Sequence, residues 1–297
     1  MATTNSSISK VSVISDFKEV TKMRLSLSVV FSAVAGYLLG ATTIDFGTLV
    51  LLAFGGYFMV GASNIYNQII ERDLDALMNR TKNRPIPAGR ISVNSALTMA
   101  IIFTILGIAT LYVINPRTAM YGAISIFLYT SVYTPLKTKT PLSVFAGAIP
   151  GAIPFMLGWV AARNAFGIEP GTLFAIQFFW QFPHFWAIGW FLFDDYKKGG
   201  FFMLPTGKRD KGTATQTIMY TIWTVLISIV PVFGVTGDLK LSIVAAVIVF
   251  AIGLGLIYYA LQLFVKRSEQ AAKHLILASV IYITLLQIIY VADKFIR

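Results

Sequence analysis

The most informative stretch of the chain is NQIIERDLDALMNRTKNRP, residues 67–85. It places three carboxylates and four basic side chains directly after an apolar run long enough to cross a bilayer. Charged residues at a membrane boundary are costly and usually functional. On a helix the spacing of Asn67, Glu71 and Asp75 keeps them within roughly 80° of one another. An amide and two carboxylates on successive turns predict a site for a hard cation such as Mg²⁺.

The basic residues that follow predict an anion site next to this metal site. Arg80, Lys82 and Arg84 come at the end of the acidic helix, where their charges can hold a phosphate group. Asp73 lies about 200° around the helix from Glu71, so we expect it to form a salt bridge and not to bind metal. The stretch therefore predicts a metal–diphosphate site at the mouth of a membrane bundle.

Composition identifies a polytopic membrane protein. Of 297 residues, 56% are hydrophobic and 12% are charged, against about 25% charged in an average soluble domain. The chain has no cysteine, which excludes disulfides, cysteine zinc sites and thiol nucleophiles. We assign the net charge of +11 to cytoplasmic loops and expect no nucleic-acid partner. The first twenty or so residues lack the pattern of a cleavable signal peptide.

Apolar segments of about 17–25 residues predict an all-α bundle around a central cavity, in a single domain over 1–297. We expect nine transmembrane helices, near 24–41, 46–68, 93–114, 118–135, 141–161, 171–193, 213–234, 240–264 and 274–293. With the N-terminus in the cytoplasm, 19 of the 24 lysines and arginines fall on the cytoplasmic side. Residues 1–22 then form a cytoplasmic tail, loops 69–92 and 194–212 share the cytoplasmic face, and the C-terminus lies outside.

The second charged loop begins with FDDYKKGGFFMLP, residues 193–205. Asp194 and Asp195 are about 100° apart on a helix, so we expect one of them to face inward and complete the metal site. Lys197 follows as a further candidate for the diphosphate. A solvated, charged helix end remains the alternative interpretation of this loop.

The aromatic run FFWQFPHFWAIGW, residues 178–190, is a candidate acceptor site. It places His184 and Trp180 in the middle of a span, where a flat aromatic or porphyrin-like acceptor could contact the histidine. Simple packing of a hydrogen-bonded histidine is the alternative. Tyr133 and Lys137 lie in a third cytoplasmic segment. Lys137 could reach a phosphate or a propionate, or could only anchor the span at the membrane surface.

These features together predict prenyl transfer. A metal-bound diphosphate is a good leaving group, an apolar cavity holds a hydrocarbon tail, and aromatic faces stabilise an allylic cation. A secondary transporter with acidic residues for ion coupling is the rival from another class. It is less favoured because the acidic residues lie at the membrane edge and no inverted repeat is visible.

Residues 67–92 resemble the Asn-xxx-Asp-xxx-Asp motif of the UbiA superfamily of intramembrane prenyltransferases, with Glu71 in place of the middle aspartate. The second motif of that superfamily is usually Asp-xxx-Asp, whereas here Asp195 is followed by Gly199. This departure, together with YTPLKTKTPLSVFAGAIPGAIPFMLGW, WQFPHFWAIGW and DDYKKGGFFMLP, is similar to the heme O synthase branch. A family member acting on a quinone precursor such as 4-hydroxybenzoate should instead carry aspartate at position 199.

The resemblance implies a multi-pass enzyme of the inner membrane, surrounded by lipid. It would use Mg²⁺, with farnesyl diphosphate as donor and heme B as acceptor, and form heme O and diphosphate. A downstream heme A synthase or terminal oxidase assembly would use the product. The implied metal ligands and catalytic residues are Asn67, Glu71, Asp75 and Asp195; the implied diphosphate-binding residues are Arg80, Lys82, Arg84, Lys137 and Lys197; the implied heme site contains His184, Trp180 and Tyr133.

Overall fold

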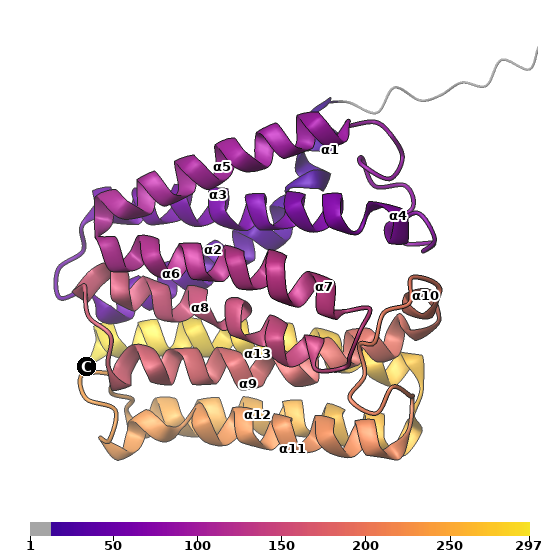
Figure 1. The fold of residues 1–297 in the computed structure, drawn as a ribbon. Helices are drawn as coiled ribbons and strands as arrows, with labels where there is room; N and C mark the ends of the chain where they lie inside the picture. Colours follow the sequence, from indigo (N-terminus) through magenta and orange to yellow (C-terminus); the bar gives the residue numbers. More distant parts are fainter. Residues whose placement is uncertain (1–12) are drawn as a thin grey trace, which may run out of the picture.

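The computed structural model describes residues 13–297, and within this range all regular secondary structure is helical (Figure 1). The helices are α1 (Val13–Val20), α2 (Met23–Gly40), α3 (Phe46–Ile70), α4 (Arg72–Asp75), α5 (Val93–Ile114), α6 (Pro116–Phe127), α7 (Thr134–Leu136), α8 (Ser143–Arg163), α9 (Ile168–Phe191), α10 (Phe193–Lys198), α11 (Lys211–Ile227), α12 (Ile243–Lys266) and α13 (Glu269–Ile296). A π-helical segment, Leu128–Tyr133, joins α6 to α7, and a 3₁₀ turn, Val230–Phe233, follows α11. The predicted all-α class is confirmed.

Seven of these helical segments are long and apolar enough to cross a membrane: α2, α3, α5, α8, α11 with its 3₁₀ turn, α12 and α13. The two other expected spans correspond to α9, which has 24 residues, and to the run from α6 through α7. Glutamine, histidine and proline interrupt the apolar residues of α9, and the π-helical segment interrupts the other run. The total of nine membrane crossings therefore remains a prediction.

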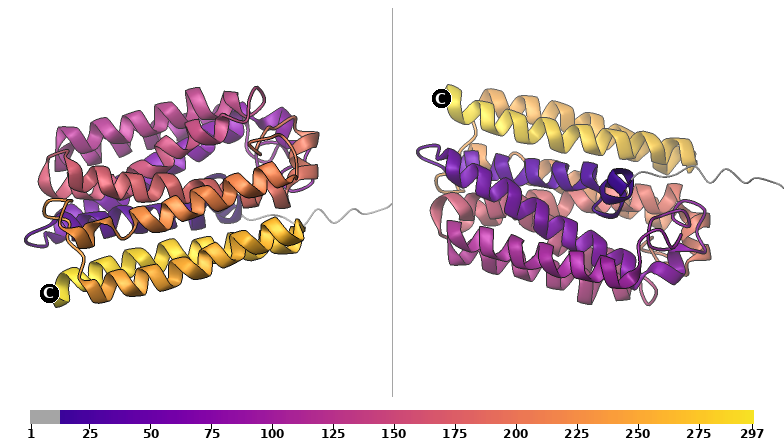
Figure 2. Two further views of the ribbon diagram at one scale, coloured as in Figure 1. Left: turned by 90° about the horizontal axis from the view of Figure 1, so that it is seen from below. Right: turned by 90° about the horizontal axis from the view of Figure 1, so that it is seen from above.

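Helices α2 and α8 lie side by side in the middle of the bundle (Figures 1 and 2). Helices α3, α5 and α6 pack on one side of this pair, and α9, α11, α12 and α13 pack on the other. Glycine allows the central pair to approach closely, because a Cβ atom at Gly158 would lie 1.9 Å from the carbonyl oxygen of Ala33. Small residues at helix contacts are typical of membrane bundles, where close backbone packing stabilises association.

The two predicted active-site loops lie at the same end of the bundle. Figure 1 shows α4, α10 and the segment after α7 at the right-hand end, and the C-terminus at the opposite end. Helix α1 lies at the loop end as well, where Arg90 forms ion pairs with Asp16 at 2.8 Å and with Glu19 at 3.2 Å. Part of the predicted N-terminal tail, residues 13–20, is thus a helix attached to the first loop; residues 1–12 lie outside the described range.

Candidate active site

The predicted metal ligands lie at the end of α3, but the helix does not continue through them. Helix α3 ends at Ile70, Glu71 has φ −94° and ψ 5°, and α4 then covers one turn. The expectation of one uninterrupted helix is therefore wrong at Glu71. The three residues still follow one another at helical spacing. The backbone amide of Glu71 donates to the carbonyl of Asn67, and the backbone amide of Asp75 donates to the carbonyl of Glu71. All three side chains are buried.

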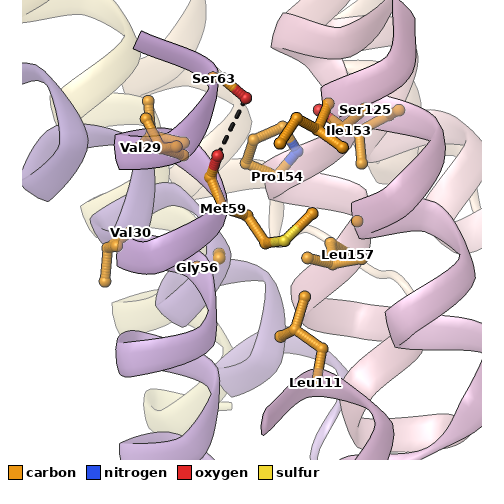
Figure 3. A pocket seen from close by; sticks show the side chains of 14 residues that line it. Val29, Val30, Gly56, Met59, Ser63, Leu111, Ser125, Ile153, Pro154 and Leu157 are labelled. Atoms are coloured by element: carbon orange, nitrogen blue, oxygen red, sulfur yellow. Dashed lines mark hydrogen bonds between the residues drawn. The ribbon is translucent and has the colours of Figure 1, made fainter. Parts of the chain in front are cut away.

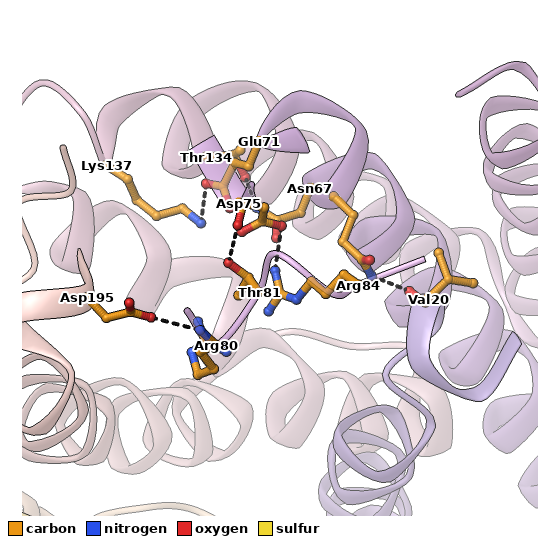
Figure 4. Close-up of polar contacts among 11 residues, drawn as sticks. Val20, Asn67, Glu71, Asp75, Arg80, Thr81, Arg84, Thr134, Lys137 and Asp195 are labelled. Atoms are coloured by element: carbon orange, nitrogen blue, oxygen red, sulfur yellow. Dashed lines mark hydrogen bonds and ion pairs between the residues drawn. The ribbon is translucent and has the colours of Figure 1, made fainter. Parts of the chain in front are cut away.

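Each of these buried groups has a specific partner (Figure 4). Asn67 donates to Thr134 Oγ1 at 3.2 Å through its Nδ2, which leaves its amide oxygen available to a cation. Glu71 forms an ion pair with Lys137. Asp75 Oδ2 accepts from Arg84 Nη1 at 2.7 Å. Burying a charge without a partner is very costly, so these pairs make the acidic cluster tolerable at the membrane edge.

The π-helical segment before α7 positions Lys137 over the end of α3. A π-helical turn inserts an extra residue into a helix and is frequent at functional sites. The Lys137 ammonium lies 4.7 Å from the centre of the Tyr133 ring, so both predicted residues are at this site. Burial lowers the pKa of Lys137, although the Glu71 carboxylate acts in the opposite direction.

Lys22 is a basic residue of this site that the sequence analysis did not select. It directly precedes α2 and has a left-handed backbone, with φ 46° and ψ 53°. Burial, followed by the charges of Arg84 and Lys137, lowers the pKa of Lys22 to about 7, while Glu71 and Asp75 act to raise it. Its position before a span had the appearance of an ordinary cytoplasmic anchor in the sequence.

Asp195 joins the second loop to the first. Its Oδ1 accepts the backbone amide of Asn79 at 2.7 Å, and its Oδ2 accepts that of Arg80 at 3.1 Å (Figure 4). Partial burial acts to raise the pKa of Asp195, but these two amides and the Lys198 ammonium lower it overall. Asp194 instead points outward, is 73% exposed and pairs with Arg209. Only one of the two aspartates therefore faces the first loop; that Asp195 completes the metal site stays a prediction.

Gly199, in the second loop, packs against the first loop. A Cβ atom at this position would be 3.0 Å from the sulfur of Met78, which is itself buried in the first loop. Any larger side chain here would have to displace Met78. The position that usually carries the second aspartate of the superfamily motif is therefore used for loop-to-loop packing in this chain.

The other predicted basic residues are farther from the buried carboxylates. Arg80 is exposed, and its guanidinium lies 5.9 Å from the centre of the Tyr196 ring. Lys82 and Lys197 are also exposed. Of the basic residues predicted for the diphosphate, the structure thus brings Arg84 and Lys137 into direct contact with the acidic cluster. Asp73 pairs with Arg72 at the surface, as expected.

The candidate acceptor residues form two separate groups. His184 and Trp180 stack with ring centroids 4.8 Å apart on α9. Ser279 of α13 contacts both, because its hydroxyl lies 2.8 Å from His184 Nδ1 and its carbonyl accepts from the Trp180 ring nitrogen at 2.7 Å. Tyr133 instead packs beside Tyr129 next to Lys137. With His184 Nδ1 engaged, Nε2 is the nitrogen left for a ligand.

An apolar pocket lies inside the bundle, next to the turns of α3 that precede Asn67 (Figure 3). Its lining includes Gly56, Met59 and Ser63 of α3, on the turns that precede Asn67, and Pro154 and Leu157 of α8. The cavity measures about 40 Å³. Met59 is flexible and unbranched, which makes it suited to move aside for a larger apolar group.

The chain matches the model of the UbiA prenyltransferase family over residues 29–283. The chain belongs to this family. A relative from Christiangramia forsetii named protoheme IX farnesyltransferase is 74% identical over 286 residues, which cover 96% of this chain and 95% of the relative. A second relative of that name, from Flavobacterium psychrophilum, is 66% identical over 289 residues and covers 96% of both chains. The predicted resemblance is confirmed.

A solved structure of a UbiA homologue from Archaeoglobus fulgidus, bound to GPP and Mg²⁺, has the same fold. It gives a TM-score of 0.67 at 17% identity, over 93% of this chain and 99% of that one. The chain is therefore a membrane-embedded enzyme of the UbiA prenyltransferase family.

The oxygen donors at this end of the bundle fit a hard divalent cation. Asn67, Glu71 and Asp75 offer one amide and two carboxylate groups on adjacent turns, and oxygen ligands of this kind suit Mg²⁺. Within residues 13–297, no three histidine, cysteine or acidic side chains cluster as a complete metal site. A bound cation would therefore need water or substrate oxygens as further ligands, as Mg²⁺ commonly does.

Proposed function

We propose that this UbiA-family enzyme transfers a farnesyl group from farnesyl diphosphate to a vinyl group of heme B, forming heme O and diphosphate. The observation that carries the proposal is the charge group of Glu71, Asp75, Lys137 and Arg84 at the end of α3, the first three of them buried, with an apolar pocket beside the preceding turns of the same helix. The relatives named protoheme IX farnesyltransferase support heme as the acceptor. The A. fulgidus homologue bound to GPP and Mg²⁺ supports a prenyl diphosphate and a metal as ligands.

The two ion pairs explain how the site can receive its ligand. Glu71 and Asp75 carry two negative charges, and Lys137 and Arg84 balance them. In a complex with magnesium diphosphate, Asn67, Glu71 and Asp75 would hold the cation with their oxygens, and Arg84 and Lys137 would contact the phosphate oxygens. The carboxylates would then be balanced by the cation in place of Lys137 and Arg84, and these two basic groups would be balanced by the phosphates in place of the carboxylates. Bound Mg²⁺ would neutralise charge that develops on the departing diphosphate.

The farnesyl tail follows α3 into the apolar pocket. Ser63 lies one turn below Asn67 and its hydroxyl is occupied by the Met59 carbonyl at 2.9 Å, so it offers little to a polar ligand (Figure 3). The rest of the lining is dominated by aliphatic side chains and glycine. Such a surface gains free energy by burying hydrocarbon, at about 25 cal/mol per Å². Movement of Met59 enlarges the cavity for the tail.

The chemistry then proceeds by ionisation and addition. The C–O bond to diphosphate breaks, and the electron pair leaves with the diphosphate. The vinyl double bond of heme B attacks the resulting allylic cation, and water captures the new cation as a hydroxyl with loss of one proton. His184 and Trp180 of α9 are assigned to the heme, with Nε2 of His184 as iron contact or proton acceptor. Tyr133, near Lys137, is assigned to the acceptor side of the diphosphate.

The charge pattern assigns the loop end of the bundle to the cytoplasm and the C-terminus to the outer side of the inner membrane. Arg80, Lys82 and Lys197, which are exposed at the loop end, attract the anionic donor from the cytoplasm before it reaches the buried groups. The product is passed on to a heme A synthase or to the assembly of a terminal oxidase.

The direct test is to incubate the purified protein with heme B, farnesyl diphosphate and Mg²⁺ and to measure the mass of the porphyrin product. The expected product is heme B with one farnesyl group and one hydroxyl added across a vinyl group. A parallel reaction contains 4-hydroxybenzoate in place of heme B. Prenylated hydroxybenzoate with unmodified heme would replace this proposal by the quinone-precursor alternative. The presence of Gly199 against Met78 argues for heme.

A further inference from the structure

The end of the apolar pocket that lies away from the acidic cluster is closed by Leu111 of α5. Figure 3 shows Leu111 at the opposite end of the lining from Ser63. Leu111 is fully buried and fills a notch between Gly55 of α3 and Gly122 of α6. A Cβ atom would lie 2.8 Å from one of its methyl carbons at Gly55, and 2.7 Å from the other at Gly122. Close packing on two sides makes Leu111 a fixed end wall.

Met59 lies across the middle of the same pocket, between Ser63 and Leu111 (Figure 3). Its side chain rests on α5, because a Cβ atom at Gly107 would lie 2.6 Å from the Met59 sulfur. Methionine is unbranched and adapts its shape easily, whereas Leu111 is branched and held between two glycines. An apolar chain that enters the pocket can therefore displace Met59 but stops at Leu111.

The distance along α3 from the acidic cluster to this end wall matches a tail of three isoprene units. Gly56, a lining residue next to the Leu111 contact, lies 11 residues before Asn67, which is about 16 Å at the rise of an α-helix. An extended chain advances about 1.2 Å per bond, so the main chain of a farnesyl group spans about 14 Å. A fourth unit would add about 5 Å, and Leu111 occupies that space.

The lining fits a hydrocarbon occupant. Its two hydroxyl groups already donate to main-chain carbonyls, Ser63 to Met59 at 2.9 Å and Ser125 to Pro150 at 3.2 Å. Every other residue of the lining is aliphatic, methionine, proline or glycine. The pocket therefore offers a prenyl tail a surface to bury and offers a polar ligand no free donor.

We propose that Leu111 determines the length of the prenyl donor, admitting three isoprene units and excluding the fourth unit of a geranylgeranyl group. This inference rests on the proposed function, because it takes the donor tail as the occupant of the pocket. It adds to that function a specificity residue that lies far from the charged groups, on a helix that contributes nothing to the diphosphate site.

Two substitutions change the pocket in opposite directions. Leu111→Ala removes the end wall and lengthens the pocket. Gly56→Ala adds a methyl group to the lining, and its nearest neighbour outside its own helix is a Val30 methyl group at 3.5 Å, an ordinary contact. The matched controls lie outside the pocket: Leu286→Ala changes an equally buried leucine of α13, and Gly171→Ala adds a Cβ with no neighbour within 4 Å on α9.

The measurement is the dissociation constant of geranyl, farnesyl and geranylgeranyl thiolodiphosphate with Mg²⁺, using the full-length protein in detergent. Leu111→Ala should shift the ratio of the geranylgeranyl and farnesyl constants at least about tenfold in favour of geranylgeranyl, because the fourth unit becomes buried. Gly56→Ala should weaken binding of the farnesyl analogue about threefold to fivefold and leave the shorter geranyl analogue within about twofold. Both controls should keep the wild-type ratios.

The proposal is overturned if Leu111→Ala binds the geranylgeranyl and farnesyl analogues in the wild-type ratio, or if Leu286→Ala shifts this ratio equally. Should Leu111→Ala fail to fold, Gly56→Ala decides, and equal weakening of the geranyl and farnesyl analogues overturns the proposal. Failure of the proposed function has a different result. A wild-type protein that binds none of the three analogues fails on the donor, and one that binds them without farnesylating heme fails on the acceptor alone.

Discussion

The ion pair between Asp75 and Arg84 gives the sharpest quantitative prediction. Arg84 Nη1 lies 2.7 Å from Asp75 Oδ2, and the two side chains are 13% and 1% exposed. At this distance, with an effective dielectric constant of about 20, the attraction is about 6 kcal/mol before desolvation is counted. Removing one partner of a buried pair usually costs about 3–5 kcal/mol, because the other charge stays buried. Asp75→Asn keeps an acceptor for Arg84, so we expect a loss of about 3 kcal/mol.

The functional effect of Asp75→Asn should exceed its effect on stability. The variant loses a proposed ligand of the metal, so farnesyl transfer should fall below detection while the protein remains folded in membranes. The double variant Asp75→Asn/Arg84→Met removes both charges. Its unfolding free energy should be about 2 kcal/mol higher than the sum of the single losses predicts, yet its activity should remain absent.

The assays are thermal unfolding in detergent and farnesyl transfer at saturating Mg²⁺. Recovered stability without recovered activity would separate the structural role of the pair from its catalytic role. Turnover of Asp75→Asn near the wild-type rate would refute the assignment of Asp75 as a metal ligand. Strict additivity of the two single losses would refute the energetic coupling of the pair.

Three further predictions concern other parts of the molecule. His184→Ala should weaken heme binding by at least about tenfold and leave the affinity for farnesyl diphosphate unchanged, as measured by titration of each ligand. Gly158→Ala should lower the free energy of unfolding by about 3 kcal/mol, because its Cβ would lie 1.9 Å from the carbonyl oxygen of Ala33. Asp195→Asn should accelerate hydrogen exchange of the Asn79 amide roughly tenfold to a hundredfold. The pKa of Asp195 is lower in the folded protein than in the unfolded chain. Its contribution to the free energy of unfolding is therefore complete above the unfolded-state pKa of about 4, and it is lost as pH falls through the folded-state pKa.

Each of these variants has a matched control in the chain. His274→Ala removes the other, exposed histidine, and equal heme affinity of both variants would take His184 out of the acceptor site. Gly171→Ala adds a Cβ with no neighbour within 4 Å and should be neutral or stabilising by up to about 1 kcal/mol. Asp194→Asn changes a carboxylate that is 73% exposed. If the Asn79 amide exchanged at the same rate in Asp194→Asn and Asp195→Asn, Asp195 would not be the residue that connects the two loops.

The part of the site that could be read from the sequence is local. Asn67, Glu71 and Asp75 are separated by one helical turn each, and backbone hydrogen bonds at i and i+4 preserve that order even where the helix breaks at Glu71. Arg84 was also predictable as part of a basic cluster in the same loop. Lys82 and Lys197 belong to the same clusters but are exposed, because sequence proximity does not decide which side of a loop faces the bundle.

The sequence alone determined that the chain crosses a membrane as a helical bundle, and that carboxylates and an amide meet at one end of α3. These properties depend on composition and on spacing within one segment, where geometry is fixed by the helix. The tertiary structure decided which cations balance those carboxylates. Lys22 and Lys137 reach the site from segments 45 or more residues away in sequence, through a left-handed joint and a π-helical turn. Charges attract more strongly where water is partly excluded than in bulk water, so the partner of each buried group is fixed by three-dimensional proximity.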